Sequence, residues 1–306
     1  MQSSPKPIHK LRMIPWLFIA GVYCSFIAGV YCSLIAWQGA NAALQSVIAE
    51  FSIAVTMAFG SFVAGGTALG GGAVAFPVMT KLLAIDPVTA KVFSLAIQSF
   101  GMSAAALTII FTGIPYYRQV VLIAAPAALV GVLLSLTFIA DQLPRLVVKG
   151  VFSVLLICFA LTLLWRIYCR VQHVCSQTDI HVSTFKVALV AVIGGVASGL
   201  VGSGADIAIF ALLIIACNAN IQKATATSVI IMAITSVVAS IANVWFFNSL
   251  SSEIQSYLLA AIPVVVVGAP LGAYVCAKVK SGQLITFFLL LIALEVSFTV
   301  YELMTA

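Results

Sequence analysis

Residues 65–77 read GGTALGGGAVAFP and residues 199–210 read GLVGSGADIAIF, and these two stretches decide the fold. Each gathers several glycines and other small residues in the middle of a long apolar run. A glycine inside a helix costs about 1 kcal/mol relative to alanine, so a membrane-spanning helix needs a reason to carry such a cluster. Small residues let neighbouring helices approach closely, and broken helices expose backbone groups that hold a substrate. Two clusters at matching places favour the second reason.

The composition identifies a membrane protein. Of the 306 residues, 63% are hydrophobic and only 7% are charged, whereas about a quarter of the residues in a soluble domain are charged. We therefore expect a multi-pass protein of the cytoplasmic (inner) membrane, with the lipid bilayer as its surroundings. The net charge of +6 comes from basic residues scattered between the apolar runs. The sequence contains no basic patch with interleaved aromatic residues, so we expect no nucleic-acid partner.

The N-terminal segment contains a tandem duplication. A basic stretch, residues 1–12, precedes an apolar run, Ile14–Trp37, in which residues 18–25 and 26–33 both read FIAGVYCS. The run is long enough to cross a bilayer of about 30 Å and longer than the core of an ordinary signal peptide. We expect an uncleaved anchor with its basic end in the cytoplasm, with a cleaved signal peptide as the alternative.

The rest of the chain divides into two similar halves. We expect an N-terminal anchor at 1–46, a first transmembrane repeat at 47–168, a polar central loop at 169–186 and a second repeat at 187–306. The fold class is all-α, with about four spanning helices in each repeat. The expected spans are Val47–Gly65, Ala90–Phe111, Val120–Ala140 and Leu146–Trp165, then Val187–Gly199, Ala224–Phe247, Tyr257–Ala277 and Leu284–Tyr301. Short apolar pieces, Ala73–Ala84 and Ile207–Cys217, follow the glycine clusters.

Two local matches support the duplication. Residues 90–94 read AKVFS and residues 224–228 read ATATS, each after a short piece and a polar turn. Pro126 with Gly131 corresponds to Pro263 with Gly268. Transporters are commonly built from such repeats, with the substrate site between them. The charge distribution leaves the topology open: inverted repeats if the short pieces cross the membrane, parallel repeats if they re-enter it.

The same residues carry a family resemblance. Gly70, Gly71 and Gly72 are followed by Pro77, Gly202-Ser203-Gly204 forms the second cluster, and Ala90 with Ser94 matches Ala224 with Ser228. This double pattern, over residues 47–303, resembles the sulfite exporter TauE/SafE family, also called the toluene sulfonate uptake permeases. The resemblance implies a secondary transporter of a small sulfur-containing anion, such as sulfite, thiosulfate or an organosulfonate. In the second copy, Ser203 replaces the middle glycine and Asp206 follows.

The candidate substrate site combines backbone amides with hydroxyls. The glycine clusters place amides at the starts of half-helices, where the helix dipole favours an anion, and hydroxyls lie on the two corresponding helices. We expect the substrate to contact Gly70, Gly71, Gly72, Ser94, Gly202, Ser203, Gly204, Thr225 and Ser228; close packing of small residues is the alternative for each of them.

Asp206 is the candidate proton-coupling residue. An ionisable side chain within the membrane is costly and usually functional, and burial in a low-dielectric interior favours the protonated carboxyl. The alternative is a structural cap, in which Asp206 bonds the first amides of the 207–217 helix. The two roles are compatible.

Other functions find little support. All three histidines, at positions 9, 173 and 181, lie in polar segments, so Ser203 has no evident buried base and we expect no enzyme. Cys169 and Cys175, with only His173 between them, make too poor a ligand set for a metal, and no cofactor is expected. The alternatives are a proton-coupled permease for another small organic solute and a non-transporting membrane scaffold. The sequence leaves homo-oligomer formation open.

Overall fold

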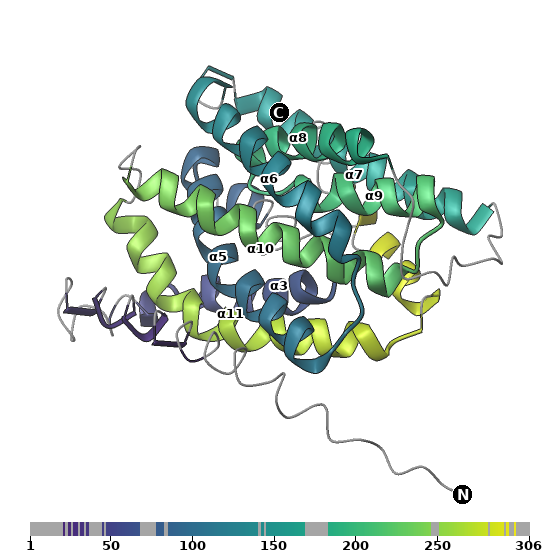
Figure 1. The fold of residues 1–306 in the computed structure, drawn as a ribbon. Helices are drawn as coiled ribbons and strands as arrows, with labels where there is room; N and C mark the ends of the chain where they lie inside the picture. Colours follow the sequence, from purple (N-terminus) through teal and green to yellow (C-terminus); the bar gives the residue numbers. More distant parts are fainter. Residues whose placement is uncertain are drawn as a thin grey trace, which may run out of the picture.

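The computed structural model describes residues 47–67, 78–82, 85–139, 142–143, 145–168, 183–245, 251–280 and 282–290, with scattered positions between 21 and 45 and at 292, 293 and 297. All of the regular structure in these residues is helical (Figure 1). The helices, in chain order, are α3 (Phe51–Gly66), α5 (Pro87–Thr112), α6 (Arg118–Leu134), α7 (Arg145–Tyr168), α8 (Thr184–Val201), α9 (Ala205–Cys217), α10 (Ile221–Trp245) and α11 (Ser252–Lys278), with short π-helical turns η1 (Val78–Leu82) and η2 (Ser135–Ile139).

Local sequence explains where several helices begin and end. Asp86 caps α5 by accepting a hydrogen bond from the backbone N–H of Val88 at 3.0 Å, and Pro87 occupies the first turn, where its missing N–H costs nothing. Ser251 caps α11 in the same way through the N–H of Ile254. Gly113 ends α5 in the left-handed conformation, with φ of 70°, which glycine adopts without steric cost.

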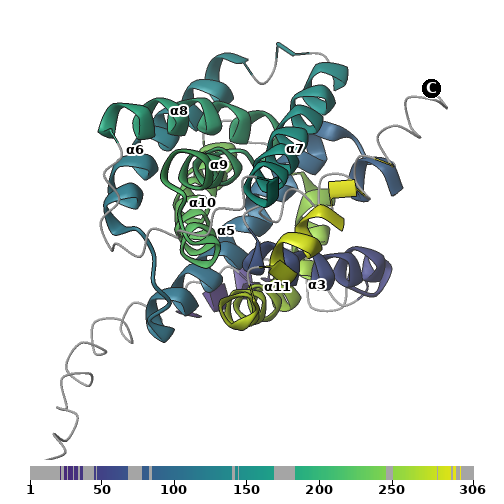
Figure 2. The same ribbon diagram turned by 90° about the vertical axis from the view of Figure 1, so that its right-hand side faces the viewer.

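The helices form three groups across the molecule. Helices α5 and α10 cross in the middle, α3 and α11 pack together on one side, and α6, α8 and α9 lie on the other. Figure 2 shows this arrangement, with α11 and α3 below α5 and α10, α8 and α9 above them, and α6 along their left side. Each glycine-rich helix therefore packs on a helix that is distant in the sequence. The helix α3 packs on α11, and α8 packs on α6.

Both of these helix pairs are close because glycines face backbone. A Cβ atom on Gly65 would lie 1.9 Å from the carbonyl oxygen of Ala269, and one on Gly272 would lie 1.9 Å from that of Phe62. In the second pair, a Cβ atom on Gly195 would lie 2.2 Å from the carbonyl oxygen of Ala128. Small residues thus allow the contact that interhelical packing within a membrane requires.

The short helix α9 is anchored by aromatic side chains. Phe210 packs against Phe159 of α7 at 5.1 Å between ring centroids, and both contact Phe288 of the helical segment 282–290. The 13 residues of α9 rise only about 20 Å, which is less than the thickness of the hydrocarbon core. α9 alone is therefore too short for an ordinary crossing.

The outer surface is suited to lipid. Five described helices are long and apolar enough to cross a membrane, namely Val88–Thr112, Arg118–Ile139, Thr184–Val201, Ile221–Trp245 and Ser252–Lys278. Shorter apolar helices span Phe51–Gly66, Ser153–Trp165 and Ala205–Cys217. Large apolar side chains point outward from them, as Phe51 and Leu122 do with 66% of each exposed. Such exposed apolar surface is expected where hydrocarbon, and not water, is the solvent.

Seven of the eight predicted spans correspond to described helices, with differences at their ends, and Leu284–Tyr301 is described continuously only up to residue 290. The span predicted at Val120–Ala140 is α6 continued by the π-helical turn η2, so its last residues are not α-helical. Of the short piece predicted at Ala73–Ala84, the structure describes 78–82 as the turn η1. Residues 68–77, most of the central loop and most of the predicted anchor lie outside the described residues.

Candidate functional site

The loop between α8 and α9 is buried inside the protein. Gly202 ends α8 in the left-handed conformation with φ of 87°, and Ser203 and Gly204 are buried behind it. A Cβ atom on Gly204 would lie 2.9 Å from the carbonyl oxygen of Gly194, a backbone atom of the adjoining helix. Gly202 and Gly204 therefore serve different needs, the first a backbone conformation and the second a close approach.

Asp206 closes this loop on itself. Its carboxylate accepts a hydrogen bond from the backbone N–H of Gly204 at 2.9 Å and from the hydroxyl of Ser203 at 3.2 Å, and only 1% of the residue is exposed. The predicted cap on the 207–217 helix is wrong in detail. The helix starts at Ala205 with Gly204 as its N-cap, so Asp206 lies in the first turn and its carboxylate reaches back to the loop.

A second side chain reaches the start of α9. The hydroxyl oxygen of Ser198, on α8, accepts a hydrogen bond from the backbone N–H of Ala205 at 2.8 Å. The first amides of a helix carry its partial positive charge. Here the amides of Gly204 and Ala205 are bonded to oxygens of Asp206 and Ser198, so the protein's own side chains occupy part of the place that an anion would take.

Helix α5 supplies the opposite wall. The side-chain amide Nε2 of Gln98 donates to the hydroxyl of Ser94 at 2.7 Å and to the carbonyl oxygen of Gly202 at 2.9 Å. Because a carbonyl oxygen can only accept, the nitrogen of Gln98 must face Gly202. A Cβ atom on Gly202 would lie 3.1 Å from the Ser94 hydroxyl oxygen, so α5 and the loop are in direct contact.

Sequence reasoning missed Gln98. Only 2% of the residue is exposed, and its oxygen Oε1 has no hydrogen-bond partner among the described residues. Gln98 also lines a cavity of about 20 Å³ between α3, α5 and α11, which is large enough for one water molecule. A polar amide inside an apolar helix, one turn after Ser94, was the available signal.

The predicted hydroxyls on α10 form no hydrogen bond to this loop among the described residues. Ser228 donates to the carbonyl oxygen of Thr225 within its own helix. The Thr225 hydroxyl has no partner among the described residues and lines a separate cavity of about 10 Å³ with Gly65 and Gln222. The structure therefore brings Ser94, Gly202, Ser203, Gly204 and Asp206 together, whereas the described hydrogen bonds join neither Thr225 nor Ser228 to that loop. Gly70, Gly71 and Gly72 lie outside the described residues.

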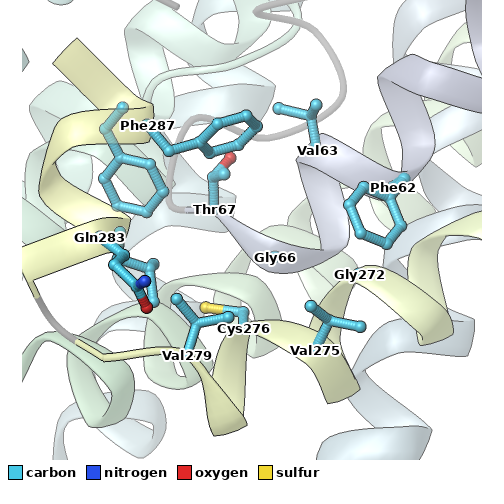
Figure 3. A pocket seen from close by; sticks show the side chains of 12 residues that line it. Phe62, Val63, Gly66, Thr67, Gly272, Val275, Cys276, Val279, Gln283 and Phe287 are labelled. Carbon is cyan, nitrogen blue, oxygen red and sulfur yellow. The ribbon is translucent and has the colours of Figure 1, made fainter. Parts of the chain in front are cut away.

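A cavity much larger than these two lies elsewhere in the molecule. It has a volume of about 370 Å³ and lies between the end of α3, the last turns of α11 and the helical segment 282–290 (Figure 3). Its walls are mainly apolar, with Phe62, Val275 and Phe287 among them, and the side chains of Thr67 and Gln283 are polar. None of the described residues predicted for the substrate site lines it. With so few polar groups, it offers an anion much less than the buried loop does.

Within the described part of the chain, no group of three or more potential metal ligands is found. The site is thus a small, buried, polar cluster between α5 and the break that separates α8 from α9. Polar groups of this kind at membrane depth are typical of substrate and ion sites in transporters.

A sequence comparison identifies the family. The sequence model of the sulfite exporter TauE/SafE family matches residues 52–297, a range that includes all of the helices from α3 to the segment 282–290. The chain belongs to the sulfite exporter TauE/SafE family. No curated protein and no solved structure matches it.

Membership settles the general class. The TauE/SafE chain is a multi-pass membrane transporter and not an enzyme. The match starts at residue 52, so the N-terminal segment with the FIAGVYCS duplication lies outside the family's common region, as predicted.

Proposed function

We propose that this TauE/SafE protein is a secondary transporter that moves a small sulfur-containing anion, such as sulfite, thiosulfate or an organosulfonate, across the cytoplasmic membrane. The observation that carries the proposal is the buried contact between α5 and the α8–α9 loop. There a broken helix presents backbone amides, hydroxyls and one carboxyl at a place shielded from lipid.

The helix pairing supports a transporter of two interlocked halves. If the repeats are 47–168 and 187–306, the first helix of each half packs on a helix of the other half. In the first half α3 packs on α11, and in the second half α8 packs on α6. Those two partners carry the matching prolines and glycines, Pro126 with Gly131 and Pro263 with Gly268. Ser94 then belongs to one half and Gly202 to the other. A site between repeats is exposed to either side in turn when one half rocks against the other.

Asp206 gives this site a way to couple protons to the anion. While its carboxylate is ionised, it holds the Gly204 amide and places a negative charge at the start of α9, which repels an anion. Protonation removes that charge and weakens the hydrogen bond to Gly204, so the positive end of α9 becomes available. A proton on Asp206 and an anion beside it are then bound together, and the anion is accepted with its charge compensated.

The binding residues of the proposal are those that the sequence predicts. Ser94, Ser203, the Gly202 carbonyl and the Gly204 amide form the part supported by the contacts described above. Gly70, Gly71, Gly72, Thr225 and Ser228 remain predictions for the part contributed by the other glycine cluster and by α10.

The test is uptake by proteoliposomes with and without an imposed pH gradient. Asp206→Asn keeps an oxygen that accepts from Gly204 but cannot ionise, so we expect a folded protein whose transport no longer responds to the gradient. Asp86→Asn is the matched control, because it removes a carboxylate from the cap of α5 and asparagine caps a helix equally well. Unchanged proton dependence in Asp206→Asn would exclude Asp206 as the coupling residue.

A further inference from the structure

Helix α11 contains a carbonyl group that its own helix cannot satisfy. In a regular α-helix the carbonyl oxygen of Leu259 accepts a hydrogen bond from the backbone N–H of residue 263. Residue 263 is a proline inside α11 and has no N–H to donate. An unpaired carbonyl at membrane depth is costly, because lipid offers no donor.

The N-terminal segment supplies the missing donor. The hydroxyl of Tyr31 donates to the carbonyl oxygen of Leu259 at 3.2 Å. The described residues between 21 and 36 are helical, and Ile27 and Tyr31, one turn apart, pack against the hydrophobic core. Cys32 and Ser33 of the same segment are exposed. One face of this helix thus contacts α11 and the other faces outward.

The contact between Tyr31 and Leu259 lies close to the part of α11 that packs against α5, next to the proposed substrate site. Two residues before Leu259, the ring of Tyr257 meets the ring of Phe93 edge-to-face, with 5.9 Å between centroids. Phe93 precedes Ser94, which receives the Gln98 hydrogen bond. A shift of the part of α11 before Pro263 would therefore move the face of α5 that contacts the α8–α9 loop.

We propose that the N-terminal helix is a docked part of the transport unit and not only a membrane anchor, with Tyr31 as the positioning residue that pairs the carbonyl group left open by Pro263. Tyr31 belongs to the second copy of the FIAGVYCS duplication. The second copy therefore has a structural role of its own, fixing the helix to α11.

A double-mutant cycle in thermal or denaturant unfolding tests this. Tyr31→Phe keeps the ring and removes only the hydroxyl, so the folding equilibrium constant should fall about threefold to tenfold, the range of one interhelical hydrogen bond in a membrane. Pro263→Ala gives residue 263 an N–H for the Leu259 carbonyl. In that background we expect Tyr31→Phe to cost clearly less, because the carbonyl keeps a donor when the hydroxyl is removed.

The second proline of α11 provides the control. Pro270→Ala also restores an N–H in α11, but to a different carbonyl, so the Tyr31→Phe loss should persist there in full. Pro263→Gly, which also carries an N–H, replaces Pro263→Ala if that variant fails to fold. The proposal is overturned if Tyr31→Phe costs nothing in the natural protein, or if its cost is the same in the Pro263 and Pro270 backgrounds.

Discussion

The close crossing of α3 and α11 makes Gly65→Ala the most informative packing variant. The added Cβ atom would lie 1.9 Å from the carbonyl oxygen of Ala269, 2.6 Å from its carbonyl carbon and 2.8 Å from its Cα. Ordinary van der Waals contact starts at 3.4 Å, so the nearest pair is about 1.5 Å too close by subtraction. All three neighbours are backbone atoms, which no change of rotamer moves away. The two helices must separate.

Two opposing effects set the magnitude. Overpacking a well-packed interior costs about 1–3 kcal/mol and sometimes more, whereas alanine gains about 1 kcal/mol over glycine in helix propensity. Because the clash is with backbone, we place the overpacking cost at the upper end of its range. We expect Gly65→Ala to lower the free energy of unfolding by about 2 kcal/mol, the difference between these two effects.

The assay is the unfolding midpoint of the purified protein in detergent, with Gly150→Ala in α7 as the control. A Cβ atom on Gly150 meets nothing within 4 Å, so only the gain in helix propensity applies and the midpoint should stay the same or rise. If Gly65→Ala and Gly150→Ala shift the midpoint alike, α3 and α11 do not cross as closely as described.

Two further predictions concern buried and terminal polar groups. Gln98→Leu leaves the Gly202 carbonyl and the Ser94 hydroxyl without their shared donor, so we expect a loss of about 1–3 kcal/mol in unfolding free energy, whereas the same change at exposed Gln119 should be nearly neutral. At Glu50, desolvation and then the nearby Glu253 carboxylate raise the pKa of the carboxyl above 4.5. The folded state therefore holds that proton more tightly than the unfolded state, and stability falls as pH rises from 4.5 through the raised pKa. Glu50→Gln should then stabilise the protein by less than about 1 kcal/mol at neutral pH and have no effect below pH 4.5; a stabilisation that persists below pH 4.5 would contradict this.

The sequence predicted the helices and the break between α8 and α9 well. Long apolar runs separated by polar turns place spanning helices with little ambiguity. The Gly202-Ser203-Gly204 cluster marked the place where a helix stops, because glycine both weakens a helix and adopts the left-handed conformation seen at Gly202. The sequence placed Ser94 and that loop in the same substrate site, but it did not predict their direct contact.

Side-chain roles inside the site were less predictable. The role of Asp206 depended on whether α9 begins at residue 205 or 207, a difference within the ordinary uncertainty of helix ends. Gln98 acts through a contact with Gly202, 104 residues away, and no local spacing reveals such a pair. On α10 buried residues lie all around the helix, so periodicity could not say which face carries Thr225 or Ser228.

The contact between Tyr31 and Leu259 could not be predicted from the sequence either. The duplication of FIAGVYCS and the presence of Pro263 are both visible in the chain. What joins them is the hydrogen bond from Tyr31 to the Leu259 carbonyl, which only the packing of the N-terminal helix on α11 brings about.

The central claim is transport of a sulfur-containing anion, and uptake by proteoliposomes of the natural protein tests it most directly. Labelled sulfite, thiosulfate, sulfate and a small organosulfonate would each be offered with and without a proton gradient. We predict that at least one of the three classes named in the proposal accumulates, and that its accumulation depends on the gradient. If the folded protein moves none of them, the sulfur-anion function proposed for this TauE/SafE chain is wrong.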